Sequence, residues 1–379
     1  MKKIGVIGSG ITATAVKEFL KNSDQFEEVS IEKADLVITS PGIPPRKWPS
    51  VNVEIISDIE FAYRILKRAK KSPKIIGITG TNGKTTIAAG LAHVLGTTAY
   101  GNIGRPLISD INALIQDDVV VIELSSFQLY ASPTLHCEIS VIINIEPDHL
   151  DWHESFEAYK NAKFNLVKPI NQLCYISESL KEDLQDKNRN MTIIETLEPV
   201  KWPQFLGVHN QQNAAIINSI ALNLGKTKQD IDQSMAAFKM PRFRCEEIYA
   251  TNELRIINDS KATNMAATLA AVQSFSGKKL LILAGQPKEA YTNMWLNQMI
   301  DHCHPIFACG YLNRHRSVFP EAFQTKIRFF NSLKDGTLAA MEETSAGTIL
   351  FSPSAASFDE FSNYMERGEA FNTYVFEKI

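Results

Sequence analysis

The sequence has no apolar stretch approaching the roughly 18 residues needed to cross a bilayer, so we expect no transmembrane helix and no membrane partner. The apolar stretch after residues 1–3 is short, broken by glycine and without a cleavage site, so it predicts a first strand and not a signal peptide. Cysteine is also sparse. The five cysteines are scattered and form no Cys-x-x-Cys pair, which indicates reduced thiols and a cytoplasmic location.

A strongly basic block is missing as well. The formal net charge is −3, and 44% hydrophobic and 21% charged residues are ordinary for a globular protein, so we expect no nucleic-acid partner. His302, Cys303, His304 and Cys309 are close enough in sequence to suggest a metal site. Alternation along a strand would place the two histidines on one face of the sheet and Cys303 on the other, which favours plain packing over a metal site.

The chain is rich in alternating strand and helix patterns. Its 379 residues exceed one typical core, so two or three domains are expected. Apolar stretches typical of strands alternate with helical patterns, which predicts an α/β fold with parallel sheets. The expected strands are 3–8, 35–39, 75–79, 119–123, 139–144, 254–257, 280–284 and 347–351. The expected helices are 12–21, 84–95, 155–167, 210–223, 263–275 and 358–377.

Two features suggest domain boundaries. A basic run at 67–73 precedes the strand at 75–79, and a helix gives way to a proline-led segment at Met240–Pro241. The predicted domains are therefore 1–72, 73–240 and 241–379.

The stretch IIGITGTNGKTTIAAGLAHVL at 75–95 predicts a buried strand, a glycine-rich loop and a helix. Such a loop can close its backbone N–H groups on phosphate oxygens at the positive end of a helix. Lys84 can reach the terminal phosphates, and the Thr85 hydroxyl can bind Mg²⁺. The general P-loop pattern would need glycine where Ile78 stands, so an ordinary strand-to-helix turn stays open as the alternative.

Two turns in the first domain predict a ligand cleft. Residues 8–13 fit the G-x-G-x-x-G/A dinucleotide pattern, but no acidic residue closes a second strand about 20 residues later, so NAD binding is not expected. A second turn, 40–42, follows the strand at 35–39. Turns at the ends of parallel strands line one cleft.

Polar residues follow two further strands. Glu123 ends the strand at 119–123 and is well placed to hold Mg²⁺ directly or through water. In the segment NIEPDHLD at 144–151, His149 could bind metal or orient a substrate, with Asp148 and Asp151 in support. A solvent-exposed strand end or a plain surface loop is the alternative for both.

Three later segments also carry polar clusters. Residues 207–213 lead into a helix and could read an adenine edge or only cap it, whereas NDSKATN at 258–264 contains more polar groups than a cap needs. Small hydroxyl residues at 352–357 precede a helix, which suits carboxylate binding. Lys163, taken alone, is an ordinary helical lysine.

Taken in order, these motifs resemble one family. The motifs are ITGTNGKTT, GNIG at 101–104, ELSSFQL at 123–129, NIEPDHLD, HNQQN at 209–213, NDSKATN and SPSAASFDEF at 352–361. Together they are similar to the Mur ligase family over essentially the whole chain. ELSSFQL and NDSKATN resemble its D-glutamate-adding branch, and the loop GTNGKTT looks like the form that the family shares.

The resemblance implies a fold and a reaction. The fold is α/β with a Rossmann-like N-terminal domain for a UDP-sugar, a central P-loop ATPase-type domain and a Rossmann-like C-terminal domain. ATP phosphorylates the carboxylate of UDP-N-acetylmuramoyl-L-alanine, and the D-glutamate amine attacks the acyl phosphate. The expected cofactors are ATP and Mg²⁺ at two sites, with a carbamylated Lys163, and the expected enzyme is a cytoplasmic monomer.

The resemblance also implies residue roles. Catalytic roles go to Lys84, His149, Lys163 and Lys261. Metal ligands are Thr85, Glu123, His149 and Lys163, since carbamylation turns an amine into an anionic oxygen ligand. ATP contacts are Gly80, Thr81, Asn82, Gly83, Lys84, Thr85, Thr86, Asn210, Asn213, Arg244 and Asp259. D-glutamate contacts are Thr263, Lys288, Ser357, Phe358 and Tyr364. UDP-sugar contacts are Ile11, Thr12, Ser40, Pro41, Gly42 and Asn102.

The sequence departs from the family pattern in several places. The stretch between Gly8 and Ser40 leaves little room for the region that usually contacts uracil. Phe243–Arg244 replaces a His-Arg pair, the turn at 284–287 is less glycine-rich, and Tyr364 stands at a closing aromatic position. Two alternatives stay open: a related amide ligase with another nucleotide-sugar or amino acid, and a non-catalytic ATP-binding module.

Overall fold

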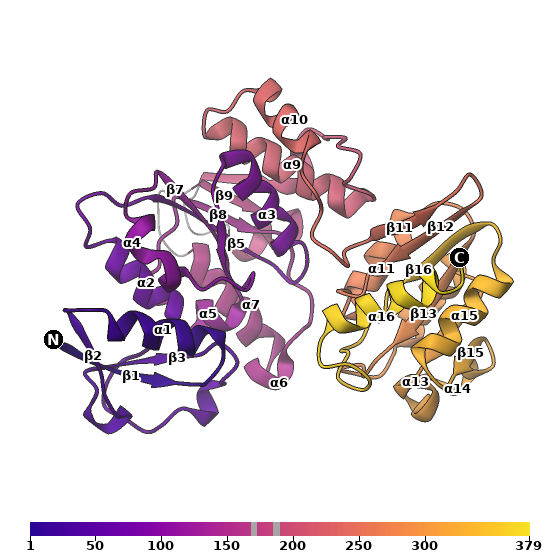
Figure 1. The fold of residues 1–379 in the computed structure, drawn as a ribbon, viewed down its shortest axis with the longest axis horizontal. Coiled ribbons are helices and arrows are strands. Elements are labelled where there is room, and N and C mark those ends of the chain that lie inside the picture. Colours follow the sequence, from indigo (N-terminus) through magenta and orange to yellow (C-terminus); the bar gives the residue numbers. More distant parts are fainter. Residues whose placement is uncertain (168–172, 185–189) are drawn as a thin grey trace. The chain divides into compact units, whose positions relative to one another are not determined.

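The computed structural model describes residues 1–167, 173–184 and 190–379. Two compact units are formed, which are described separately here (Figure 1). The first comprises residues 1–202 and 212–238, and the second comprises 203–211 and 239–379. The first unit contains two sheets and the second contains one.

The first sheet is fully parallel, with strand order β2-β1-β3-β4. Its strands are β1 (Lys2–Ile7), β2 (Phe26–Glu28), β3 (Leu36–Thr39) and β4 (Ile55–Ser57). Helices α1 (Ile11–Lys21) and α2 (Asp58–Leu66) accompany it. Helix α2 begins at a Ser57 cap, whose hydroxyl accepts a hydrogen bond from Glu60 N.

The second sheet is also parallel, with order β10-β9-β8-β5-β7-β6. Its strands are β5 (Lys74–Thr79), β6 (Ala99–Gly101), β7 (Val119–Glu123), β8 (Ile139–Ile142), β9 (Leu173–Ile176) and β10 (Asn190–Ile193). The helices of this region are α3 (Lys84–Leu95), α4 (Ile111–Leu114), α5 (Ser126–Tyr130), α6 (Leu150–His153), α7 (Phe156–Phe164), α8 (Lys181–Leu184), α9 (Val208–Asn223) and α10 (Lys228–Ala236). Strand β5 lies between β8 and β7, which brings the ends of three strands to one edge.

The third sheet has order β11-β12-β16-β13-β14-β15, and only the β11–β12 pair is antiparallel. Its strands are β11 (Glu246–Ala250), β12 (Leu254–Asn258), β13 (Lys279–Ala284), β14 (Ile306–Cys309), β15 (Ile327–Phe330) and β16 (Gly347–Phe351). Its helices are α11 (Met265–Ser274), α12 (Asn293–His302), α13 (Tyr311–Arg314), α14 (Glu321–Gln324), α15 (Leu333–Glu343) and α16 (Tyr364–Phe376).

The cores of the two units are organised differently. In the first unit, one continuous apolar cluster contains residues from both sheets, among them Ile4, Ile38, Ile75 and Val120. In the second, successive residues of the strands alternate between two clusters, so that both faces of the sheet are covered. A parallel sheet buried on both faces explains why its strands appear in the sequence as nearly unbroken apolar stretches.

The structure confirms the α/β fold and the expected strands to within two residues at their ends. Helix α16 is a correction, because it begins at Tyr364 and not at 358. Asn363 caps it by accepting hydrogen bonds from Met365 N and Glu366 N, and the residues before it form a loop. All five cysteines are free and buried. Within the described ranges, no helix has both the length and the apolar character that a bilayer span needs.

Candidate active site

The glycine-rich loop joins β5 to α3 at the centre of the second sheet. Thr79 ends the strand and Lys84 begins the helix. Gly83 caps the helix with φ of 88°, a left-handed conformation that would strain a side chain. The N-terminus of a 12-residue helix therefore opens directly onto the loop, as phosphate binding requires.

Asn144, two residues beyond the end of β8, holds this loop in place. Its Oδ1 accepts hydrogen bonds from Thr81 N at 3.0 Å and Asn82 N at 2.9 Å. Lys84 lies against the same loop, where its Nζ donates to the carbonyls of Gly80 at 2.7 Å and Thr81 at 2.9 Å. The predicted loop residues therefore form one compact structure. The two threonines that follow the lysine are half-buried and buried, respectively: Thr85 and Thr86.

Glu123 stands at the end of β7 and pairs in register with Ile78 of β5. The carboxylate is buried. Its Oε1 accepts a hydrogen bond from Asn102 Nδ2 at 2.7 Å, whereas Oε2 has no hydrogen-bond partner among the described residues. The backbone at Gly101 lies close to the backbone of Glu123, and only glycine fits there, because a Cβ would lie 2.3 Å from the Glu123 carbonyl oxygen. Glu123 thus carries a buried oxygen that is available to a ligand.

Lys163 of α7 is almost completely buried, with 1% of its surface exposed. Its Nζ donates to the Gly80 carbonyl at 2.9 Å and lies 4.7 Å from the centre of the Tyr159 ring. Burial, reinforced by the charge of Lys84, holds the pKa of Lys163 well below its usual value. Burial therefore favours the neutral form of the amine beside the phosphate loop.

Tyr159 links the loop to this helix, a role that the sequence did not single out. Its hydroxyl lies 2.9 Å from Thr81 Oγ1, which also accepts a hydrogen bond from Glu146 N at 2.9 Å. Burial raises the pKa of Tyr159, so the phenol stays protonated. The signal in the sequence was a tyrosine one helical turn before Lys163 on the same face.

His149 occupies the cap position of α6 in a left-handed conformation with φ of 55°. Its ring packs edge-on against Phe127, and its Nε2 lies 3.7 Å from Asp148 Oδ2. Asp148 also accepts a hydrogen bond from the backbone N–H of His149 at 2.9 Å. The aspartate therefore supports the histidine as predicted, and the imidazole itself is exposed.

The two predicted turns of the first sheet lie side by side. Ser40 N donates to the Ile7 carbonyl at 2.9 Å, and the Ser40 hydroxyl is buried without a hydrogen-bond partner among the described residues. Ile11 is 71% exposed beside these turns, although an apolar side chain of that size is usually buried. The other predicted contacts here are at least partly accessible: Thr12, Pro41 and Gly42. Asn102, by contrast, is placed at Glu123.

The second unit gathers its own group of predicted residues. Asp259 is buried, and its carboxylate accepts hydrogen bonds from Cys245 N at 3.1 Å and Ser352 Oγ at 2.8 Å. Burial raises the pKa of Asp259 to about 7, against the opposing effect of these hydrogen bonds and of Arg244. The predicted Arg244 segment and the NDSKATN turn are therefore neighbours.

Arg367 joins the loops of this group and was missed in the sequence. It is completely buried, and its guanidinium donates to the carbonyls of Ala284 (3.0 Å), Ala355 (2.9 Å) and Ser260 (2.8 Å). Ala284 is the last residue of β13, whereas Ala355 and Ser260 lie in the loops that follow β16 and β12. The available signal was an arginine in line with Phe371 and Val375 on the buried stripe of α16.

The remaining predicted residues differ in accessibility. Lys261 lies with its Nζ 4.0 Å from the centre of the Tyr364 ring. Ser357 is buried, Phe358 is 74% exposed, Lys288 is exposed and Thr263 is half-buried. In helix α9, Asn210 donates to the Leu206 carbonyl at 2.9 Å, whereas the Asn213 Oδ1 reaches the space beside Gly83. Asn213 therefore lies at the phosphate loop.

Comparison with known proteins matches this arrangement. The family description of the Mur ligase middle domain matches residues 78–272. A UDP-N-acetylmuramoylalanine–D-glutamate ligase from Francisella tularensis subsp. mediasiatica (strain FSC147) is 31% identical over 409 aligned positions, covering 98% of this chain and 95% of that protein. The chain belongs to the Mur ligase family. A ligase of the same name from Francisella tularensis subsp. novicida (strain U112) is 30% identical with the same coverage.

Solved Mur ligases share the fold at low identity. MurF ligase from Thermotoga maritima in complex with ADP aligns with a TM-score of 0.65 and 15% identity, covering all of this chain and 96% of that one. MurC from Thermotoga maritima aligns with a TM-score of 0.60 and 16% identity over the full length of both. This Mur ligase therefore has the three-domain fold of the family and is an ATP-dependent ligase of peptidoglycan precursor synthesis.

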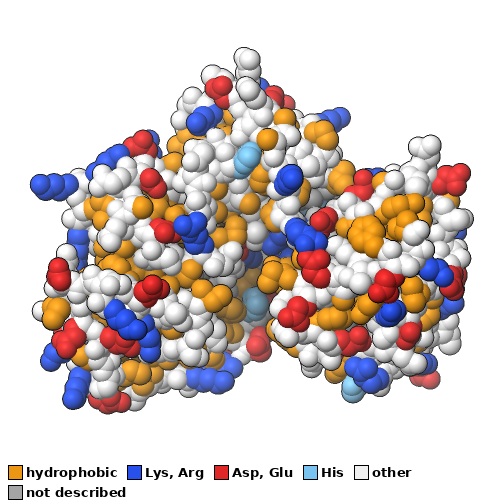
Figure 2. All heavy atoms as spheres, in the orientation of Figure 1, with side chains coloured by type: hydrophobic (Ala, Val, Ile, Leu, Met, Phe, Trp, Pro, Cys, Tyr) orange, Lys and Arg blue, Asp and Glu red, His pale blue; other side chains and the backbone are white. Residues whose placement is uncertain are grey.

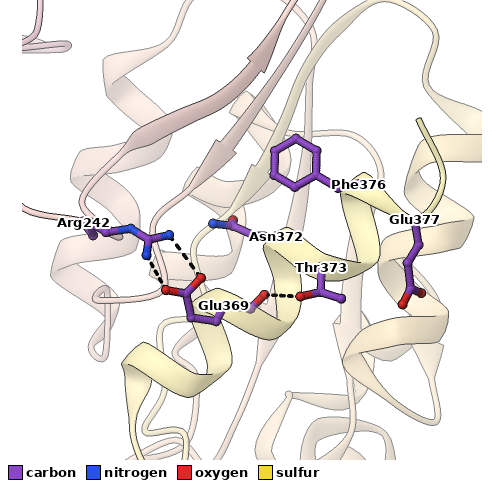
Figure 3. Close-up of a pocket in the computed structure, with 6 residues that line it drawn as sticks. All are labelled: Arg242, Glu369, Asn372, Thr373, Phe376 and Glu377. Atoms are coloured by element: carbon purple, nitrogen blue, oxygen red, sulfur yellow. Dashed lines mark hydrogen bonds and ion pairs between the residues drawn. The ribbon is translucent and has the colours of Figure 1, made fainter.

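One open pocket of the Mur ligase lies in the second unit (Figure 3). It encloses about 480 Å³ and is lined by Arg242 and residues of α16. The guanidinium of Arg242 is already paired with Glu369, and Thr373 Oγ1 donates to the Glu369 carbonyl at 3.0 Å.

Charges of both signs are interspersed over the face shown in Figure 2, in keeping with the small net charge.

Proposed function

We propose that this Mur ligase adds D-glutamate to UDP-N-acetylmuramoyl-L-alanine with consumption of ATP. The observation that carries the proposal is the convergence of Lys84, Glu123 and Lys163 at one edge of the second sheet, in a chain 31% identical to a ligase named for that reaction. ATP phosphorylates the substrate carboxylate, the amine of D-glutamate attacks the acyl phosphate, and the tetrahedral intermediate collapses to an amide and phosphate.

The residues of the phosphate loop suit the first step. Lys84 places a positive charge beside the loop, where it stabilises charge that develops on the transferring phosphoryl group. Asn144 holds the loop backbone and Tyr159 holds the Thr81 side chain before the nucleotide binds, so little reorganisation is needed during transfer. The buried edge of the sheet also limits the access of water, which protects an acyl phosphate from hydrolysis.

Magnesium fits the donor atoms at this edge. Among residues 1–167, 173–184 and 190–379, no three histidine, cysteine, aspartate or glutamate side chains meet as a metal-binding group. The unpaired Oε2 of Glu123 nevertheless offers one buried anionic oxygen. We propose that Thr85 and Glu123 hold one Mg²⁺ and that His149 helps to hold a second. When bound, Mg²⁺ supplies charge neutralisation for the phosphates.

Lys163 becomes a further ligand in this proposal through carbamylation. A neutral amine attacks the carbon of CO₂ and releases one proton, which gives an N-carboxylate. The depressed pKa of Lys163 supports this step, because the ammonium form lacks the electron pair that attacks. Carbon-13 NMR of protein equilibrated with labelled bicarbonate should show a carbamate signal that the Lys163→Met variant lacks; a signal of equal intensity in that variant would refute the modification.

The C-terminal group supplies the amino-acid site in the proposal. Arg244, Asp259 and Asn210 face ATP, as does Asn213 beside the loop. Lys261 acts near the phosphates, and D-glutamate is held by Thr263, Lys288, Ser357, Phe358 and Tyr364. We also propose that the UDP-sugar binds at Ile11, Thr12, Ser40, Pro41, Gly42 and Asn102, and that the enzyme is a cytoplasmic monomer.

The test is phosphate release from ATP in the presence of UDP-N-acetylmuramoyl-L-alanine. We expect release to depend on D-glutamate, with L-glutamate and omission of the nucleotide-sugar as controls. Release that is indifferent to D-glutamate would refute the proposal. A related ligase with another substrate is the second candidate, because only a three-residue strand, β2, and one short 3-10 turn separate α1 from β3. A panel of nucleotide-sugars and amino acids separates the two.

A further inference from the structure

A segment of the first sheet holds the short helix that begins at His149. The 3-10 turn Pro45–Lys47 carries Arg46, whose guanidinium reaches more than 100 residues along the chain to α6. Nη2 donates to the Asp151 carbonyl at 2.8 Å, and Nη1 lies 3.4 Å from the Trp152 carbonyl oxygen. Both carbonyls belong to the second and third of the four residues of α6, and donors near a helix C-terminus satisfy carbonyls that lack a partner within the helix.

Helix α6 has little stability of its own. It has four residues, and the residues at its two ends, His149 and Glu154, both adopt left-handed conformations with φ of 55° and 67°. A single helical turn is unfavourable in isolation, and each non-glycine residue in a left-handed conformation adds strain. Contacts from outside the helix must therefore fix it, and Arg46 provides them at the end opposite His149.

The same segment begins at the turn proposed for the nucleotide-sugar. Ile43 N donates to the Ser40 carbonyl at 3.2 Å, and Trp48 Nε1 donates to the Ile43 carbonyl at 3.0 Å. These bonds make 40–48 one closed loop with Arg46 near its tip. Trp48 also packs edge-on against Tyr130, with ring centres 6.0 Å apart.

An aromatic path runs in parallel with the arginine. Tyr130 packs edge-on against Trp152 of α6 at 5.4 Å, Trp152 contacts Phe127 at 4.8 Å, and Phe127 contacts His149 at 4.8 Å. The loop 40–48 therefore contacts both the end of α6 and the rings that surround His149. A change at the turn 40–42 has a direct physical route to the imidazole.

We propose that Arg46 is a positioning residue for His149. By capping α6, it couples occupancy of the 40–42 turn to the placement of the imidazole beside the phosphate loop. The coupling to the nucleotide-sugar rests on the proposed function, whereas the capping itself does not. Arg46 acts only through α6 and makes no contact with a reacting group.

The chain offers a matched control. Lys47 lies in the same 3-10 turn, carries the same charge and is exposed. Arg46→Ala removes both donors, Arg46→Lys leaves one ammonium that can reach one carbonyl, and Lys47→Ala removes a neighbouring charge only. A charge-assisted hydrogen bond at a guanidinium that is 46% exposed leads us to expect effects of about five- to tenfold.

The first measurement is hydrogen exchange of the ligand-free protein. The amides of 150–154 should exchange about fivefold faster in Arg46→Ala, less so in Arg46→Lys, and at the wild-type rate in Lys47→Ala. Equal exchange in Arg46→Ala and Lys47→Ala would overturn the capping. Uniformly faster exchange across the first unit would also overturn it, because a merely structural role predicts that pattern.

The second measurement adds UDP-N-acetylmuramoyl-L-alanine without ATP. In the wild type, protection should appear at 8–12 and 40–42 and extend to 149–154; in Arg46→Ala it should remain at the turns and be lost at 149–154. Loss of protection at both places in the variant overturns the coupling. Absence of protection at the turns of the wild type would contradict the proposed function and leave the ligand-free result as the test of capping. In turnover, kcat should fall about five- to tenfold with the KM for ATP unchanged.

Discussion

Lys163 and Arg367 are both completely buried basic side chains, one in each unit, yet burial affects their pKa values to different extents. Lys163 donates to one carbonyl at 2.9 Å and has a second oxygen at 3.4 Å, and burial drives its pKa down. Arg367 donates to three carbonyls and to Ser260 Oγ at 3.2 Å. Burial lowers its pKa only to about 10, so it stays charged near neutrality. The guanidinium starts from a higher intrinsic pKa than the amine, and the nearby charges of Asp359 and Asp259 oppose the effect of burial on Arg367.

The difference also separates two uses of a buried nitrogen. A buried amine with a lowered pKa is a candidate for modification, whereas a guanidinium that donates to several carbonyls fixes their backbones. Lys163 contacts the end of one strand of the second sheet, whereas Arg367 links the ends of three strands of the third.

The largest expected effect comes from replacing the buried amine of Lys163. Lys163→Arg would place a permanent cation there and Lys163→Met an inert side chain, and both should lower D-glutamate-dependent phosphate release by about 1,000-fold. Lys160→Met, on the same helix and largely paired with Asp183, should stay within a few-fold of wild type. If Lys163→Arg retained turnover, the neutral amine would be irrelevant and the comparison with Arg367 would fail.

Arg367 should show its effect in stability. Arg367→Met leaves the carbonyls of Ala284, Ala355 and Ser260 without these donors, so the free energy of unfolding should fall by about 3 kcal/mol. Arg367→Lys should lose less, since an ammonium can still donate. Urea denaturation followed by tryptophan fluorescence measures both, with the half-exposed Arg328→Met as the control. Equal midpoints for Arg367→Met and the control would show that the buried guanidinium does not hold the loops.

Asp58 extends the comparison to an acid. It is buried at the start of α2, and burial raises its pKa to about 6, opposed mainly by a hydrogen bond from Gln128. Because the folded state binds this proton more tightly than the unfolded state, stability should fall as pH rises from about 4 to about 6 and level off above. The contribution is about 3 kcal/mol at most.

The measurement is the free energy of unfolding against pH for Asp58→Asn. The variant should lack the downward slope between about pH 4 and 6, whereas the exposed Asp118→Asn should keep it. An unchanged slope in Asp58→Asn would mean that Gln128 and the helix N-terminus keep the carboxylate ionised despite its burial.

Sequence patterns predicted the strands that are long and apolar and the motifs at their ends. Strands β2, β4 and β6 were missed because three residues carry no readable periodicity. Strands β9, β10, β11, β14 and β15, of four or five residues each, were not predicted either. Helix α16 was started too early because apolar residues at 358 and 361 continue its pattern, and only the Asn363 cap marks the true start.

The site was predictable where chemistry follows a strand. Glu123, Lys84 and His149 are examples, because parallel strands bring their carboxyl ends to one edge. Tyr159 and Arg367 could not be found in this way, since their roles depend on oxygen atoms that are distant in sequence and meet only in the fold. The lowered pKa of Lys163 likewise depends on burial, which cannot be predicted from the presence of a lysine in a helical sequence pattern.

The continuous core of the first unit has a consequence for how the chain can be divided. Three sheets suggest three separable pieces, and the basic run at 67–73 marks a natural place to cut. Yet Ile4 and Ile38 share one apolar cluster with Ile75 and Val120. A truncation there would expose apolar surface on both fragments, so we expect neither fragment to fold stably without the other.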